Sequence, residues 1–240
     1  MPGPHSGVYS LCPRHLGPDL SYNSGGISII LRAQTGIILG ALALALAAPG
    51  RGVAQIEAGF RLGIYAPAGA YVSEGDGYPG GRLEMQGVGA PLIGGQAVFW
   101  PRSWLGIEAT GFLSPSMVAL TDASGTADHT STVMFASARA LIPVTSRKAL
   151  WSFYVGGGIG LVNRSGGVWD RFESGMTAPT AIVLFGGSTP LSETLRMRFQ
   201  FEDNFSTAQF DAGLATETQP HSHQDIMFAI AVEFHVGGRR

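Results

Sequence analysis

Apolar and polar residues alternate through the stretch "AQIEAGFRLGIYAP" at residues 54–67. Ile56 and Phe60 fall on one side of an extended chain, while Glu57 and Arg61 fall on the other. A period of two indicates a β-strand whose two faces meet different environments. Water on the Glu57 side would make this an ordinary soluble sheet. Lipid on the Phe60 side would make the protein an inverted barrel.

Seven further stretches repeat this pattern, and the sequence after residue 54 shows no helical periodicity. The eight predicted strands are 55–66, 91–101, 104–113, 131–144, 150–162, 178–189, 193–206 and 224–236. Three connections are tight turns, and the other four are long polar loops near 67–90, 114–130, 163–177 and 207–223. Such alternation is typical of an up-and-down antiparallel meander, which closes without a free edge when it has eight strands.

The two faces of these strands differ in the size of their side chains. Phe, Ile, Leu and Trp gather on one face, and the other carries Gly, Ala, Ser and Tyr with isolated Arg and Glu. Only 13% of the chain is charged and Lys148 is its single lysine, whereas soluble domains carry roughly 25% charged residues. An eight-stranded barrel has a lumen only wide enough for side chains. We therefore predict an all-β, eight-stranded transmembrane barrel with its apolar face toward lipid.

Alternation directs eight charged side chains into the predicted lumen. They are Glu57, Arg61, Glu108, Arg139, Arg196, Arg198, Glu202 and Glu233. The four arginines and four glutamates balance in charge, and charges in a narrow interior of low dielectric are tolerated only when they are paired. We expect an ion-pair network that plugs the lumen. The alternative is a narrow gated pore whose network rearranges.

Three tryptophans lie beside the predicted short turns. Trp100 and Trp104 flank "PRS" at 101–103, and Trp151 follows "TSRKA" at 145–149. Aromatic residues concentrate at the two membrane–water interfaces of transmembrane barrels. These positions predict an interfacial aromatic girdle.

The longest apolar run, residues 36–48, is too short to span a bilayer, which takes roughly 20 residues. Arg32 precedes it, and the small residues Gly52 and Ala54 follow it at the spacing of a peptidase site. This order of basic, apolar and small residues predicts a secretory signal peptide cleaved between Ala54 and Gln55.

The N-terminal segments divide accordingly. Residues 31–54 are the predicted signal peptide, and residues 55–240 are the predicted barrel. Residues 1–30 are interpreted as a start assigned too early or as a disordered extension. Cys12 lies in that segment, so the mature chain has no cysteine for a disulfide, a thiolate nucleophile or a metal site.

With a cleaved signal, eight alternating strands, tight turns such as "WPRSWLGIEA" (100–109) and an aromatic-rich last strand, the chain resembles the small OmpA/OmpX-type outer-membrane β-barrels. The resemblance implies a barrel in the outer membrane of a Gram-negative-type cell envelope. Its partners would be outer-membrane lipid, lipopolysaccharide and the outer-membrane assembly machinery. That machinery reads a terminal aromatic residue in such chains, whereas "EFHVGGRR" here continues past Phe234.

The long loops are acidic. Their acids are Glu74, Asp76, Glu84, Asp122, Asp128, Asp170, Glu173, Asp211 and Glu217, against the basic residues Arg82, Arg164 and Arg171. Such loops would bind divalent cations that bridge lipopolysaccharide phosphates, or would simply be solvated loop tips.

Two histidine fragments invite other interpretations. "HTS" (His129–Ser131) resembles the His-x-Ser pair of barrel-embedded lipid A deacylases, but Leu141, Ile142 and Pro143 stand where those enzymes carry an acid. "HSH" at 221–223 offers a metal two imidazoles without a third ligand.

We therefore predict no catalytic residue, cofactor or metal, and the lack of a basic stripe argues against nucleic-acid binding. The predicted function is a structural or surface-interaction role through the four long loops. The alternatives are a barrel-embedded lipid-modifying enzyme and a narrow gated pore.

Overall fold

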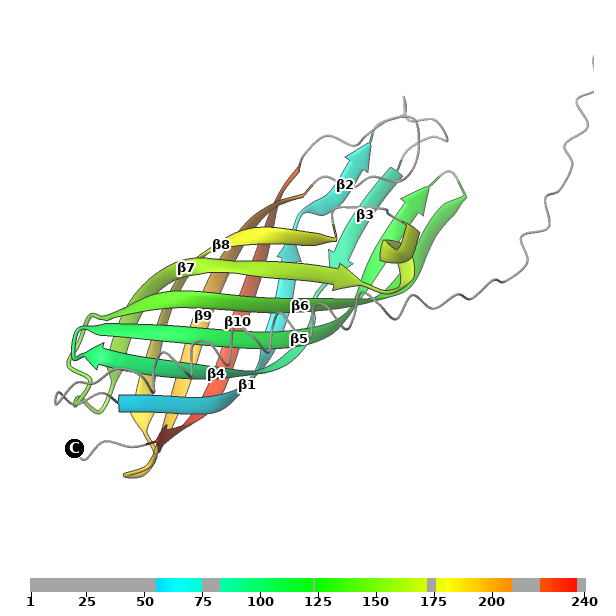
Figure 1. Cartoon of the computed structure of the whole chain (residues 1–240). Coiled ribbons are helices and arrows are strands. Elements are labelled where there is room, and N and C mark those ends of the chain that lie inside the picture. Colours follow the sequence, from blue (N-terminus) through cyan, green and yellow to red (C-terminus); the bar gives the residue numbers. More distant parts are fainter. Residues whose placement is uncertain (1–54, 75–82, 123, 172–175, 209–220, 237–240) are drawn as a thin grey trace, which may run out of the picture.

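The computed structural model describes residues 55–74, 83–122, 124–171, 176–208 and 221–236, which lie mostly in antiparallel strands (Figure 1). The elements are β1 (Gln55–Ala68), β2 (Ala70–Glu74), β3 (Leu83–Val88), β4 (Ala90–Arg102), β5 (Leu105–Asp122), β6 (Gly125–Pro143), β7 (Ser152–Ser165), the 3₁₀ helix η1 (Gly167–Arg171), β8 (Thr177–Pro190), β9 (Leu195–Ala208) and β10 (His221–Val236). No helix in these ranges is long and apolar enough to cross a bilayer. The predicted extension and signal peptide, including Ala54, lie outside the described residues, and Gln55 begins β1.

The strands close into a barrel. β1 pairs with β4 on one side and β10 on the other, and β5 pairs with both β4 and β6. The remaining neighbours, β6 to β10, pair in chain order. The ring therefore contains eight strands and no free edge, so the predicted up-and-down barrel is confirmed. We call the end with the connections 103–104, 144–151 and 191–194 the short-turn end, and the opposite end the outer end.

Two of the predicted loops are largely strand. Gly69, with φ of 90°, separates β1 from β2, which pairs with β3 to form a hairpin at the outer end. Residues 114–130, predicted as a loop, form the outer halves of β5 and β6, paired up to Asp122 and Gly125. The prediction was wrong because polar side chains are compatible with a strand that is paired along its length, and this hairpin continues the barrel wall (Figure 1).

The apolar face of the strands points outward. On β1, Phe60, Leu62 and Ile64 are 74%, 62% and 60% exposed, whereas Glu57 and Arg61 are buried. A continuous exposed apolar band of this kind marks a surface in contact with lipid. The inverted arrangement predicted from the alternation is therefore correct.

The lumen is filled by side chains in layers. A buried cluster near the short-turn end contains Val98, Leu141 and Tyr154, and a larger one toward the outer end contains Phe112 and Phe135. The rings of Phe112 and Phe135 stack with centroids 4.9 Å apart. The alternation pattern predicts small residues and charges in the lumen, and the structure adds an aromatic layer toward its outer end.

Candidate functional site: the charged network of the lumen

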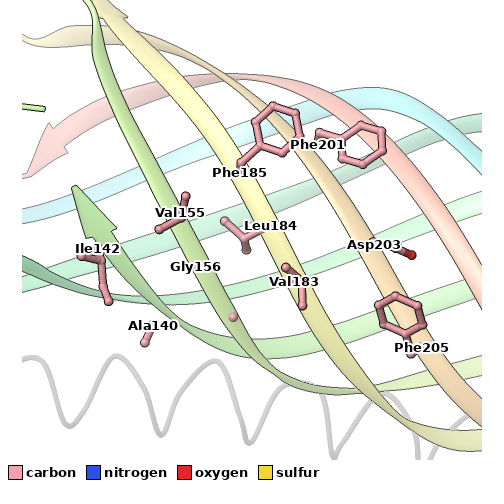
Figure 2. A pocket seen from close by; sticks show the side chains of 11 residues that line it. Ala140, Ile142, Val155, Gly156, Val183, Leu184, Phe185, Phe201, Asp203 and Phe205 are labelled. Atoms are coloured by element: carbon pink, nitrogen blue, oxygen red, sulfur yellow. The ribbon is translucent and has the colours of Figure 1, made fainter. Parts of the chain in front are cut away.

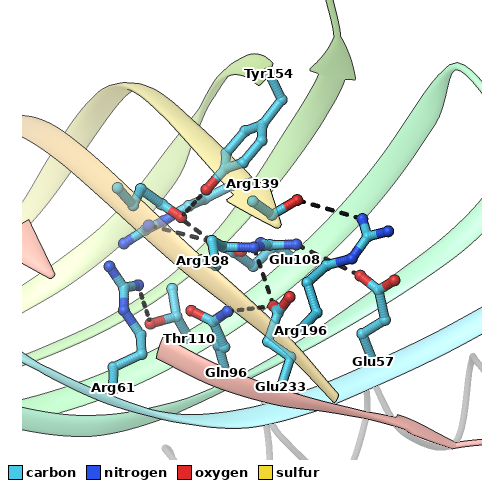
Figure 3. Close-up of polar contacts among 12 residues, drawn as sticks. Glu57, Arg61, Gln96, Glu108, Thr110, Arg139, Tyr154, Arg196, Arg198 and Glu233 are labelled. Atoms are coloured by element: carbon cyan, nitrogen blue, oxygen red, sulfur yellow. Dashed lines mark hydrogen bonds and ion pairs between the residues drawn. The ribbon is translucent and has the colours of Figure 1, made fainter. Parts of the chain in front are cut away.

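Arg198 on β9 is the centre of the buried charged network (Figure 3). Its Nη1 lies 2.6 Å from Glu108 Oε2, its Nε 3.0 Å from Glu233 Oε1 and its Nη2 3.5 Å from Glu57 Oε2. None of these four side chains is more than 2% exposed. One guanidinium therefore joins carboxylates that project from three other strands, β1, β5 and β10.

The network continues toward the outer end through two more arginines. Arg139 Nη2 lies 2.7 Å from Glu202 Oε2, and Arg139 Nη1 lies 3.3 Å from Glu108 Oε1. Arg61 pairs with the other oxygen of Glu202 and donates a hydrogen bond of 3.1 Å to Thr110 Oγ1. Ion pairs thus run without interruption from Arg61 to Arg198 across the interior of the barrel.

Arg147 covers this network at the short-turn end. It lies between β6 and β7, where the sequence analysis placed only a turn, and its Nη2 is 2.8 Å from Glu57 Oε1. Its guanidinium stacks 3.8 Å above the ring of Trp100, whose Nε1 donates a 2.8 Å hydrogen bond to Glu57 Oε2. A long arginine side chain can reach from a turn into the barrel while its stem covers apolar surface.

The predicted girdle position of Trp100 is wrong, because its side chain is 3% exposed and lies in the lumen. Gln96 and Val98 face inward on the same strand, and a period of two carries Trp100 inward with them. Gly106 on β5 makes room for the indole, since an added Cβ would lie 2.7 Å from the Trp100 ring. Trp104 and Trp151, which are 57% and 46% exposed beside the short turns, remain the predicted girdle residues.

Seven of the eight predicted lumen charges belong to one connected network of ion pairs, and Arg196 is the exception. Arg196 donates hydrogen bonds to Ser188 Oγ at 3.3 Å and to the Arg147 carbonyl oxygen at 3.0 Å. It forms no ion pair with a carboxylate of the described residues. Arg147 takes its place, so four arginines and four glutamates still balance.

Sequence reasoning missed a second polar cluster near the outer end. Arg164, predicted as a loop residue, is fully buried on β7, and its Nη2 lies 2.8 Å from Asp225 Oδ2. The hydroxyl of Tyr65 donates a 2.8 Å hydrogen bond to Asp225 Oδ1 and lies 2.6 Å from the Tyr71 hydroxyl. One feature of the sequence could have indicated this cluster. The alternation on the last strand turns Asp225 into the lumen, where a buried carboxylate needs a cationic partner.

Trp169 of η1 closes the lumen beside this cluster. Its side chain is fully buried, its ring meets Tyr71 edge-on at 5.2 Å, and its Nε1 donates a 2.7 Å hydrogen bond to Ser131 Oγ. The Ser131 hydroxyl of the His-x-Ser pair is therefore buried in the lumen and occupied by an indole. This placement does not suit a nucleophile that acts on membrane lipid.

Of the two histidines in "HSH", the structure describes the side chain of His223 alone. His223 is buried with its ring 5.4 Å from that of Tyr71, while the side chain of His221 lies outside the described part of the chain. Within the described ranges, no group of three or more His, Cys, Asp or Glu residues is placed to hold a metal ion. Of the acidic loop residues, Asp122 and Asp128 are exposed on the hairpin of β5 and β6.

No protein-family model and no curated protein matches this chain, but solved structures do. The outer membrane protein OprG from Pseudomonas aeruginosa matches with a TM-score of 0.55 at 10% identity, covering 77% of this chain and 96% of OprG. The outer membrane protein AlkL, solved in lipid bilayers, has a TM-score of 0.49 at 14% identity and covers 80% and 95%. The E. coli outer membrane protein W has a TM-score of 0.45 at 14% identity and covers 78% and 100%.

At these identities the likeness concerns the fold alone, and OprG is the match on which the assignment depends. The closed ring of eight strands and the lipid-facing apolar belt agree with it independently. The chain therefore has the fold of the small eight-stranded outer-membrane β-barrels, with an apolar belt on its outer face.

Proposed function

We propose that the barrel is closed to solutes and that it has a structural or surface-interaction role through its outer end. The observation that carries this proposal is the uninterrupted series of buried ion pairs from Arg61 to Arg198. The series crosses the lumen instead of lining a path through it, because Arg139 and Arg198 each bridge carboxylates from different strands.

Opening this lumen would require several buried pairs to separate together. Leaving one buried charge without its partner costs about 3–5 kcal/mol, and Glu202 and Glu108 are each shared by two arginines. The aromatic layer and Trp169 close the outer half as a second barrier. A thermally opened pore would therefore be rarely populated.

The outer end offers a polar surface for interaction. The β5–β6 hairpin presents the exposed carboxylates of Asp122 and Asp128 beyond the lipid-facing belt. Carboxylate oxygens are ligands for divalent cations, which supports contact with the phosphates of lipopolysaccharide. A role as an enzyme is not part of the proposal, because Ser131 is buried and bound to Trp169.

Planar-bilayer recording tests whether the lumen is closed. The wild-type barrel is expected to show no discrete conductance steps. Arg198→Ala combined with Arg139→Ala, which removes two bridges of the network, should produce small steps, and Trp104→Ala on the outside serves as the matched control. Steady conductance in the wild type, unchanged by the double variant, would refute the plug and make a pore the function.

A further inference from the structure

A groove of about 570 Å³ crosses the outside of the barrel over β6, β7, β8 and β9 (Figure 2). Its floor follows one row of directly paired residues, Ala140, Gly157, Val183 and Asp203. The neighbouring row forms one wall and consists of Ile142, Val155, Phe185 and Phe201. The volume lies within the roughly 300–1,000 Å³ of small-molecule sites.

The groove exists because two residues of the floor, Ala140 and Gly157, are small and lie among bulkier side chains. Gly157 faces outward, and a Cβ added there would have one neighbour within 4 Å, the Ile182 carbonyl oxygen at 3.2 Å. Phe185 and Phe201 stand beside it with their ring centroids 5.3 Å apart. Four strands spaced about 4.8 Å apart make a trough about 14 Å long, which suits an extended alkyl chain.

The carboxylate of Asp203 lies at one end of this apolar trough. Its Oδ2 accepts a 2.7 Å hydrogen bond from Gln224 Nε2, while its buried Oδ1 accepts none from any residue that the structure describes. The segment 209–220 that follows β9 contains no lysine or arginine. A carboxylate on a lipid-facing surface is costly unless both of its oxygens have partners. An additional hydrogen-bond donor would therefore stabilise Asp203, and a cationic donor matches its negative charge best.

We propose that the groove binds a membrane phospholipid with a primary-ammonium headgroup. One acyl chain lies along the floor row beside the wall formed by Phe185 and Phe201, and the ammonium N–H donates to the Asp203 carboxylate. The occupant is a lipid because the groove opens within the apolar belt, where lipid is the surrounding medium. This site lies on the outside of the barrel and does not depend on the lumen being closed.

Native mass spectrometry of the barrel with three phospholipids of identical acyl chains tests the proposal. Phosphatidylethanolamine carries the N–H donor, phosphatidylcholine carries a quaternary ammonium without N–H, and phosphatidylglycerol carries no cation. Retention of phosphatidylethanolamine is expected to exceed that of the other two about tenfold, the scale of one charge-assisted hydrogen bond. Asp203→Asn should bring the three lipids close to parity.

Gly157→Leu fills the floor and should abolish retention of all three lipids. Its matched control is Gly111→Leu, at another outward-facing glycine outside the groove, where an added Cβ would have only the Phe135 carbonyl oxygen nearby, at 3.7 Å. Equal retention of the three lipids by the wild type, or equal effects of the two glycine variants, would overturn the proposal. A dimer mass that disappears in Gly157→Leu would overturn it too, and would make the groove a contact between copies. If Gly157→Leu does not fold, the comparison of Asp203→Asn with the wild type decides.

Discussion

Replacing Arg198 by methionine is the sharpest test of the lumen network. The substitution keeps much of the side-chain volume and removes the guanidinium that contacts three glutamates. Glu57 keeps Arg147 and Glu108 keeps Arg139 as partners. Glu233 loses its only cationic partner among the described residues and retains the side chain of Gln96. The perturbation therefore amounts to one uncompensated buried carboxylate.

The expected loss of unfolding free energy is about 3–5 kcal/mol, the cost of breaking a buried ion pair from one side. Arg196→Met provides the control, because Arg196 lies two residues away on the same strand face and makes two hydrogen bonds without an ion pair. Because the Arg196 side chain is half-buried and one of its two hydrogen bonds is 3.3 Å long, losing both should cost only about 1–3 kcal/mol. Glu233→Gln added to Arg198→Met removes the stranded charge and should restore a measurable part of the loss.

Equilibrium unfolding in urea from lipid vesicles, followed by tryptophan fluorescence, measures these differences. The order of stability should be wild type, Arg196→Met, the double variant and then Arg198→Met. If Arg198→Met is no less stable than Arg196→Met, or if Glu233→Gln brings no recovery, the lumen is hydrated and the ion pairs do not hold the barrel closed.

The same unfolding assay checks three further expectations. Phe60→Arg replaces an outward-facing side chain that is 74% exposed by a charged one, and should cost about 2–4 kcal/mol, the scale for arginine on the lipid face of a barrel. No loss would contradict the inverted arrangement. Gly186→Ala should cost about 1–3 kcal/mol by overpacking, because the added Cβ would collide with the Tyr154 side chain. Gly95→Ala is the control and should be neutral, because the nearest neighbour of its added Cβ lies 3.6 Å away. Trp169→Ala should cost about 3–5 kcal/mol and far more than Trp104→Ala, and equal losses would show that η1 does not seal the barrel.

The local sequence decides whether each side chain of a strand points into the lumen or toward lipid. Applied to every strand position, the same rule also places several aromatic residues in the lumen. The alternation on β4 assigns Trp100 to the lumen together with Gln96 and Val98, yet its position beside a turn favoured the girdle interpretation. Phe112 and Phe135 likewise fall on the inward side of β5 and β6. The assumption that bulky aromatics belong outside therefore failed at the ends of the lumen, where the ion pairs leave space to be filled.

The sequence by itself determined the eight strands, their order and the sign of each face, because the period of two is a property of the extended backbone. Only the tertiary structure decided which charges meet. Arg61 and Glu202 are 141 residues apart, and their contact depends on the stagger between strands that closure of the barrel fixes. The same holds for Arg147 and Arg164, which looked like turn and loop residues until the closed ring placed Glu57 and Asp225 within their reach. The ion-pair partners depend on the closed ring of strands, whereas the direction of each side chain depends only on its own strand.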